Sequence, residues 1–217
     1  MTELRSKSIN YSPLTRRGRR AEALAGELLT PGMKVGLFGG TFDPPHTGHS
    51  HLAKTAMKRL GLDRVWWLVS PQNPLKTQAS DSMEHRLAAV AQQACSPGMV
   101  VTDLESRLGS CRTIDIVLAL KKRHPLVHFV WLMGADNLAS FHRWAKWKNV
   151  FENIPIAVMA RPQDPVRARL SPAAKWAAKS RICEHMAHIL PLKKAPAWTY
   201  LTEPLHSASS TDIRAQR

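Results

Sequence analysis

The chain has 217 residues, 44% of them hydrophobic and 22% charged, which excludes a disordered or fibrous protein and fits one globular domain with a real core. Its longest apolar stretches, such as 65–69 and 129–132, fall far short of the roughly 20 residues that cross a bilayer, so we expect no membrane segment. The formal net charge of +15 calls for an anionic partner, and both nucleic acid and nucleotide phosphate qualify.

The first segment, 1–32, lacks the apolar region of a signal peptide, and its arginine cluster at 16–20 is followed by an alanine-rich stretch. We expect a basic extension here, helical or disordered, followed by a single domain at 33–217. The chain has three widely spaced cysteines and no CxxC pair, so neither a zinc site nor a redox dithiol is expected. These features favour a reducing, cytoplasmic location.

From residue 33 onward, strand-like and helix-like patterns alternate along the chain. Strands are predicted at 33–38, 64–70, 99–103, 127–133, 156–160 and 198–201. Helices are predicted at 48–60, 82–94 and 113–123, with short helical pieces up to 151 and a partly helical region at 171–188. This alternation predicts a Rossmann-like, doubly wound α/β fold, with a mostly parallel sheet and helices on both faces.

Ligands of such sheets bind beyond the carboxyl ends of the strands, on the loops that lead into helices. Glycine or polar signatures occur in five of these loops, at 39–49, 71–80, 134–136, 160–162 and 209–214. We therefore expect the functional site at this edge of the sheet.

The loop at 39–49 has the properties of a phosphate site. Gly39 and Gly40 end the first strand, where backbone N–H groups can approach an anion with no Cβ in the way. His46 and His49 are three residues apart at the start of the next helix, where the helix dipole also favours negative charge. The alternatives are two surface histidines on a glycine- and proline-rich turn, or a zinc site, for which no third ligand is nearby.

Two strings in this loop resemble the HxGH nucleotidyltransferases, namely Gly39-Gly40-Thr41-Phe42-Asp43-Pro44 and His46-Thr47-Gly48-His49. The combination is most similar to the bacterial nicotinate mononucleotide adenylyltransferases. Further segments that resemble this family lie at 73–76, 134–136, 141–144, 160–162 and 209–214. The resemblance thus extends from 33 to 214.

The resemblance implies roles for three sets of residues. The catalytic set, expected to grip the triphosphate from two sides, is His46, His49 and Arg214. The ATP-binding set adds Gly39, Gly40, Thr41, Phe42, Gly134, Asp136, Arg161, Ser209, Ser210 and Thr211. The acceptor-binding set is Lys76, Thr113 and Trp144, with the indole stacked on a pyridine ring.

The residues alone leave ordinary structural alternatives open. The hydroxyls at 209–211 can simply cap a helix, and Asp136 can do the same after its buried strand. Lys76 and Arg161 can be solvated surface charges. Trp144 can be a core residue, since the chain has seven tryptophans.

The implied reaction joins ATP and nicotinate mononucleotide to give nicotinate adenine dinucleotide and pyrophosphate, a step of NAD biosynthesis. The acceptor phosphate is already ionised at neutral pH, so no general base is expected. Catalysis would come from aligning two polyanions and stabilising the leaving pyrophosphate with His46, His49, Arg214 and Mg²⁺. The Mg²⁺ would be held mainly by ATP phosphates and water, without a protein metal site.

Three rival interpretations remain. The nearest is another HxGH enzyme, a phosphopantetheine adenylyltransferase or a cytidylyltransferase, and a close variant prefers the amide mononucleotide. The third is a basic nucleic-acid-binding protein that uses the arginines at 16–20, which is disfavoured because the positive charge is spread along the chain and no nucleic-acid-reading motif appears. The sequence leaves open whether the chain forms a homo-oligomer.

Overall fold

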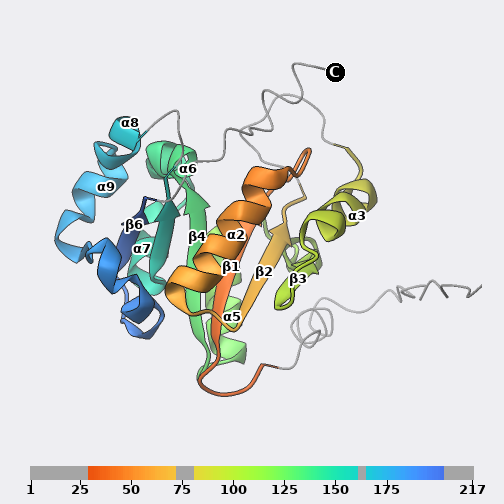
Figure 1. Cartoon of the computed structure of the whole chain (residues 1–217), viewed down its shortest axis with the longest axis horizontal. Helices are drawn as coiled ribbons and strands as arrows, with labels where there is room; N and C mark the ends of the chain where they lie inside the picture. The colour runs from red at the N-terminus through yellow and green to blue at the C-terminus, as the bar shows by residue number, and fades with distance from the viewer. Residues whose placement is uncertain (1–28, 72–80, 161–164, 203–217) are drawn as a thin grey trace, which may run out of the picture.

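A six-stranded parallel sheet forms the centre of the molecule in the computed structural model, which describes residues 29–71, 81–160 and 165–202 (Figure 1). The strand order is β3-β2-β1-β4-β5-β6. The strands are β1 (Lys34–Gly40), β2 (Arg64–Val69), β3 (Met99–Thr102), β4 (His128–Gly134), β5 (Ile156–Met159) and β6 (Trp198–Leu201). The predicted α/β class and all six predicted strands are confirmed, and no strand end differs by more than two residues.

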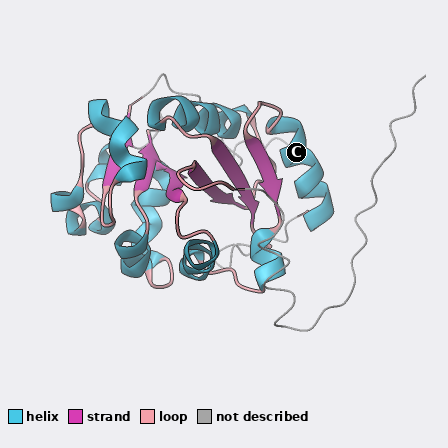
Figure 2. Ribbon diagram, turned by 90° about the horizontal axis from the view of Figure 1, so that it is seen from below, coloured by secondary structure: helices cyan, strands magenta, loops and turns pink. Residues whose placement is uncertain are grey.

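Helices cover both faces of this sheet, as the view along the layers shows (Figure 2). One face carries α2 (Thr47–Leu60), α3 (Met83–Gln93) and η3 (Glu184–Leu192). The other carries α4 (Leu104–Leu108), α5 (Thr113–Arg123), α6 (Ala135–Ser140), η1 (Phe141–Arg143), α7 (Trp147–Asn153), α8 (Pro165–Arg169) and α9 (Pro172–Trp176), and η2 (Ala178–Ser180) follows α9. We call these the α2 face and the α5 face.

Side chains of each strand alternate between the two faces, so both sides of the sheet are buried. In β1, Val35 and Leu37 join the core under α5, while Phe38 joins the core under α2. Trp66 and Leu68 of β2 lie with the first pair. This alternation determines which face of the sheet each side chain at the carboxyl end of a strand points to.

The chain crosses from one half of the sheet to the other between β1 and β4. It runs outward from β1 through β2 to β3, returns to β4 beside β1, and continues to β6. The connections that leave β1 and β4 therefore diverge at their carboxyl ends, which is the position where sheets of this type bind ligands. The loop at 39–49 and the start of α6 meet this condition.

Two features of the sequence-based description need correction. The first strand, predicted at 33–38, extends through Gly39 to Gly40, because parallel pairing with β2 continues to Val69. The helices α4 and α8 were not predicted, because each has five residues and shows too little of the helical period to be recognised.

The predicted extension at 1–32 lies mostly outside the described residues. Its described part contacts the domain, because Leu29 packs on the core under α5 and the N–H of Gly32 donates to the carbonyl of Leu126 at 2.8 Å. Within the described residues no helix is long and apolar enough to span a membrane.

Candidate active site

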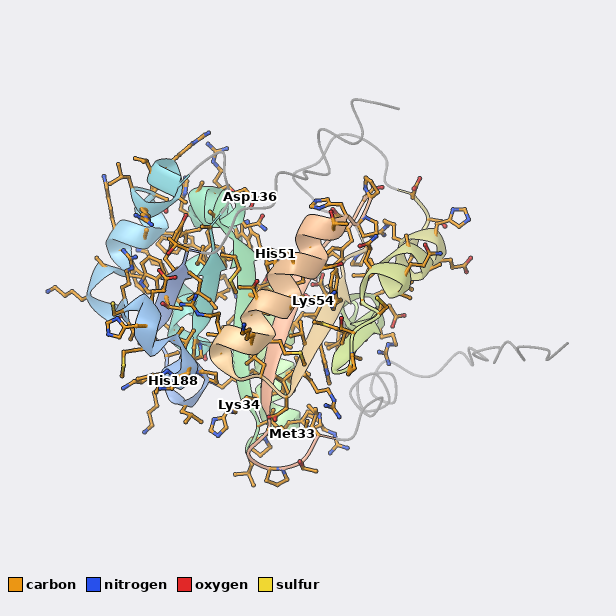
Figure 3. All side chains as sticks on the ribbon, in the orientation of Figure 1. Met33, Lys34, His51, Lys54, Asp136 and His188 are labelled. Atoms are coloured by element: carbon orange, nitrogen blue, oxygen red, sulfur yellow. The ribbon has the colours of Figure 1, made fainter. Side chains whose placement is uncertain are left out.

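The predicted site residues that the structure describes lie at the carboxyl edge of the sheet. Figure 3 shows Asp136 at this edge and Met33, just before β1, at the opposite one. The described members are Gly39, Gly40, Thr41, Phe42, His46, His49, Thr113, Gly134, Asp136 and Trp144. The other predicted members, Lys76, Arg161, Ser209, Ser210, Thr211 and Arg214, lie outside the described residues, and their roles remain predictions.

The two glycines at the end of β1 lie close to aromatic rings, and the contact is tighter at Gly39 than at Gly40. A Cβ on Gly39 would lie 2.6 Å from Cη2 of Trp131, which β4 holds at 1% exposure. A Cβ on Gly40 would face the opposite way, 3.1 Å from the ring of Phe42. Neither glycine has a positive φ. The missing Cβ of Gly39 therefore leaves room for the indole of Trp131.

The left-handed residue of this turn is Phe42, with a φ of 47°. Such a conformation costs a residue with a Cβ about 1 kcal/mol or more. The ring is buried and packs on Phe38 at 5.2 Å, Trp67 at 5.2 Å and His49 at 5.1 Å between ring centroids. This aromatic packing offsets the backbone strain and fixes the path of the turn towards α2.

The two histidines of the HxGH string lie against each other at the start of α2. Their ring centroids are 3.8 Å apart, as the three-residue spacing predicts. The main-chain N–H of His46 donates to Nδ1 of His49 at 3.2 Å, and the N–H of His49 donates to the carbonyl of His46 at 2.9 Å. Because Nδ1 of His49 accepts a hydrogen bond, the proton of its neutral ring is on Nε2.

The electrostatics of this helix start favour an anion. The first turn of α2 contains no acidic residue, so the helix dipole is not neutralised by a side chain of that turn. The Nε2–H of His49 can therefore donate to a phosphate oxygen where the helix dipole also favours negative charge.

The predicted acceptor residues lie on the α5 face. Thr113 is the first residue of α5, and the next residue, Ile114, is in the core of that face. Trp144 is half-buried and packs against Phe141 at 4.9 Å and Trp131 at 6.5 Å between ring centroids. The indole is therefore at the rim of the core, where it packs on one side and can meet a ligand on the other.

Gly134 and Asp136 mark the change from β4 to α6. Gly134 is buried at the end of the strand, and Asp136 is an exposed residue in the first turn of the helix. A carboxylate at this position also stabilises the helix start through the dipole, so the helix-capping alternative is compatible with the geometry.

Glu105 of α4 is a site residue that the sequence analysis missed. It is only 4% exposed, and its Oε1 is 3.8 Å from the position of a Cβ on Gly39. Burial raises the pKa of Glu105 to about 7, and a hydrogen bond from the side chain of Ser70 partly opposes this. Since an acidic residue flanked by Leu and Ser resembles an ordinary surface residue, only burial reveals it.

Comparisons with known proteins agree on a nucleotidyltransferase family. The model of the cytidylyltransferase-like family matches residues 37–216. A protein of Ruegeria pomeroyi named probable nicotinate-nucleotide adenylyltransferase is 49% identical over 85% of this chain and 87% of its own length. One of the same name from Caulobacter sp. is 52% identical over 85% of this chain and 98% of its own.

This chain belongs to the nicotinate-nucleotide adenylyltransferase family. The fold agrees with that membership: a nicotinic acid mononucleotide adenylyltransferase of Plasmodium falciparum, solved with NaAD, has a TM-score of 0.64 at 17% identity. That alignment covers 84% of this chain and 83% of the other. The nucleotidyltransferase interpretation and its place in NAD biosynthesis are thereby confirmed.

The Gly39–Trp131 contact predicts that one added methyl group destabilises the protein more at Gly39 than at Gly40. We expect Gly39→Ala to lower the free energy of unfolding by about 2 kcal/mol, or Tm by roughly 6 °C, because the buried indole cannot move away. Gly40→Ala is the matched control, since the ring of Phe42 needs to yield only slightly, and it should cost about 0.5 kcal/mol. Thermal and urea unfolding measure both, and equal losses would show that the indole is not the obstacle.

Glu105 predicts a pH-dependent stability. Its folded pKa of about 7 lies above the ordinary value of 4.5, so the folded protein holds the proton more tightly and stability falls as pH rises from about 4.5 to about 7. Glu105→Gln should remove this loss. The free energy of unfolding of the variant should therefore exceed that of the wild type by on the order of 2 kcal/mol at pH 8 and equal it at pH 4. Urea unfolding at both pH values measures the difference, with exposed Glu84→Gln as the control for a lost charge; a gain that is the same at both pH values would contradict the assignment.

Proposed function

We propose that this protein transfers the adenylyl group of ATP to nicotinate mononucleotide, releasing pyrophosphate and forming nicotinate adenine dinucleotide. The observation that carries this proposal is the pairing of His46 and His49 at the start of α2, directly after the glycine end of β1. The names of relatives about half identical to this chain support the choice of substrates. The three cysteines are exposed and form no disulfide, in keeping with a reducing, cytoplasmic location.

In this proposal the two substrates occupy opposite faces of the sheet edge. The triphosphate lies on the α2 side, against the His46–His49 pair and the helix start. The pyridine ring lies on the α5 side, against Trp144 and near Thr113. The β1 end passes between them, so the acceptor phosphate can approach the α-phosphate of ATP across the Gly39–Gly40 segment.

The chemistry requires alignment and charge stabilisation, without proton abstraction. Nε2–H of His49 donates to the oxygens of the leaving pyrophosphate, and His46 fixes the orientation of that ring through its main-chain N–H. Arg214 and the hydroxyls at 209–211 are proposed to hold the same phosphates from the other side. Asp136 and Arg161 are proposed to contact the adenosine, and Lys76 the acceptor.

A divalent cation fits this arrangement as a partner of the nucleotide. Within 29–71, 81–160 and 165–202 no group of three His, Cys, Asp or Glu side chains is placed to hold a metal ion. We propose Mg²⁺, coordinated mainly by phosphate oxygens and water, which would neutralise charge on the leaving pyrophosphate.

The test of the proposed function is a comparison of substrates under one condition. The purified protein is incubated with Mg²⁺ and ATP together with nicotinate mononucleotide, nicotinamide mononucleotide or phosphopantetheine, and CTP replaces ATP in a parallel set. We expect rapid pyrophosphate release with ATP and nicotinate mononucleotide, with a dinucleotide product of matching mass. Release only with phosphopantetheine, or only with CTP, would overturn the proposal in favour of another HxGH enzyme.

The phosphate role of His49 is tested by a variant that preserves its structural hydrogen bond. In His49→Asn, Oδ1 can replace Nδ1 as the acceptor for the N–H of His46, whereas the Nε2 donor is lost. We expect kcat to fall by roughly 10²- to 10³-fold, as for loss of one transition-state donor. His51→Asn on the same helix (Figure 3) is the control and should retain activity; similar kcat values for the two variants would refute the role of His49.

A further inference from the structure

Arg86 is a buried cation that the proposed mechanism does not use. It is the fourth residue of α3, and only 3% of its surface is exposed. Burial lowers the pKa of its guanidinium, while the nearby carboxylates of Asp43 and Asp81 raise it. An arginine is kept in such a position only when its donors are satisfied, because removing the cation from water is costly.

Five acceptors surround the five N–H donors of this guanidinium. Nε donates to the carbonyl of Asp81 at 2.9 Å, and Nη1 donates to the carbonyls of Thr41 at 3.0 Å and Ser70 at 2.6 Å. Nη2 donates to the carbonyl of Pro71 at 2.8 Å and approaches the sulfur of Met83 at 3.8 Å. Four of the five acceptors are main-chain oxygens, so Arg86 determines backbone positions.

These backbone oxygens come from three separate segments of the chain. Thr41 belongs to the turn after β1, Ser70 and Pro71 follow β2, and Asp81 precedes α3. A direct bond joins the first two segments as well, since the N–H of Ser70 donates to the carbonyl of Gly40 at 3.0 Å. The guanidinium is the point at which all three segments meet.

The joined segments serve different substrates in the proposed reaction. Thr41 lies between the glycines and the His46–His49 pair, on the path that binds ATP. Ser70 follows Val69 and, by strand alternation, faces the α5 side, where its hydroxyl bonds to Glu105. Glu105 in turn lies beside Gly39, next to the indole of Trp131, against which Trp144 packs.

We propose that Arg86 is a positioning residue that sets the distance between the ATP-binding turn and the acceptor side of the site, and thereby aligns the two substrates. This inference rests on the proposed function for its kinetic consequence. Arginine is required because its planar fork reaches acceptors on three segments at once, whereas the ammonium of a lysine donates from one point. A misplacement of about 1 Å between reacting groups can cost on the order of 10² in rate.

The experiment compares Arg86→Lys with Arg59→Lys. Arg59 also lies on a helix and is also hydrogen-bonded, but its partner is Glu184, away from the turn. Three quantities are measured for each variant: the Kd for ATP without acceptor, the KM for nicotinate mononucleotide, and kcat per ATP-binding equivalent of protein. Normalising kcat in this way removes the effect of any unfolded fraction.

For Arg86→Lys we expect kcat to fall by roughly 30- to 100-fold while the ATP Kd and the KM change by less than about 3-fold. Arg59→Lys should leave all three near the wild-type values. In Arg86→Ala, added guanidinium ion should restore a part of kcat that it does not restore in the wild type. Normal kcat in Arg86→Lys, or a loss that vanishes on normalisation, would overturn the proposal.

Hydrogen exchange provides a readout that does not depend on the acceptor. In the ATP complex, Arg86→Lys should exchange faster than wild type both in the peptide containing Thr41 and in the peptide containing Ser70. Faster exchange in only one of the two would refute the coupling. If the wild-type protein made no dinucleotide from any acceptor, the proposed function would be wrong, and the exchange result would still decide whether Arg86 joins the two segments.

Discussion

The hydrogen bonds from Arg86 to four main-chain oxygens constrain the backbone around the candidate site. Carbonyl groups that follow the ends of strands normally turn towards water or continue into helices. Here three of them, together with the carbonyl of Asp81 before α3, accept hydrogen bonds from one cation. The arrangement holds the turn after β1 and the end of β2 in one orientation. Because the His46–His49 pair follows that turn, its position relative to the rest of the edge depends on the same guanidinium.

The two hydrophobic cores support different parts of this edge of the sheet. The α2 face supplies the aromatic packing around Phe42, which supports the histidines. The α5 face supplies Trp131, Trp144 and Glu105. Each proposed subsite is therefore an extension of one hydrophobic core, and its rigidity derives from close packing of large rings.

Much of the fold was accessible from the sequence because buried parallel strands appear as short apolar runs. The strand at 64–70 is an example: all of its residues from Val65 to Val69 are buried. The same reasoning placed His46 and His49 correctly, since their spacing and the start of α2 are local properties. The contact of Gly39 with Trp131 could not be predicted in this way, because the two residues are distant in the sequence.

Arg86 and Glu105 could not be identified in this way. Each is a charged residue in a helix whose sequence pattern allows it to face solvent. Their burial results from segments that meet only in the folded chain, the ends of β1 and β2 for Arg86 and the Gly39 backbone for Glu105. Patterns along the chain do not reveal which distant segments come into contact, so buried charged residues of this kind can be recognised only in a structure.

Gly39 and Gly40 face opposite sides of the sheet, and this restricts the length of β1. Adjacent residues of a strand face opposite sides, so one peptide unit separates the side of Trp131 from the side of Phe42. Inserting or deleting a single residue in β1 would exchange these sides and place the wrong surface towards each substrate. A change of one residue in the length of this strand is therefore excluded, because it would turn each glycine towards the wrong core.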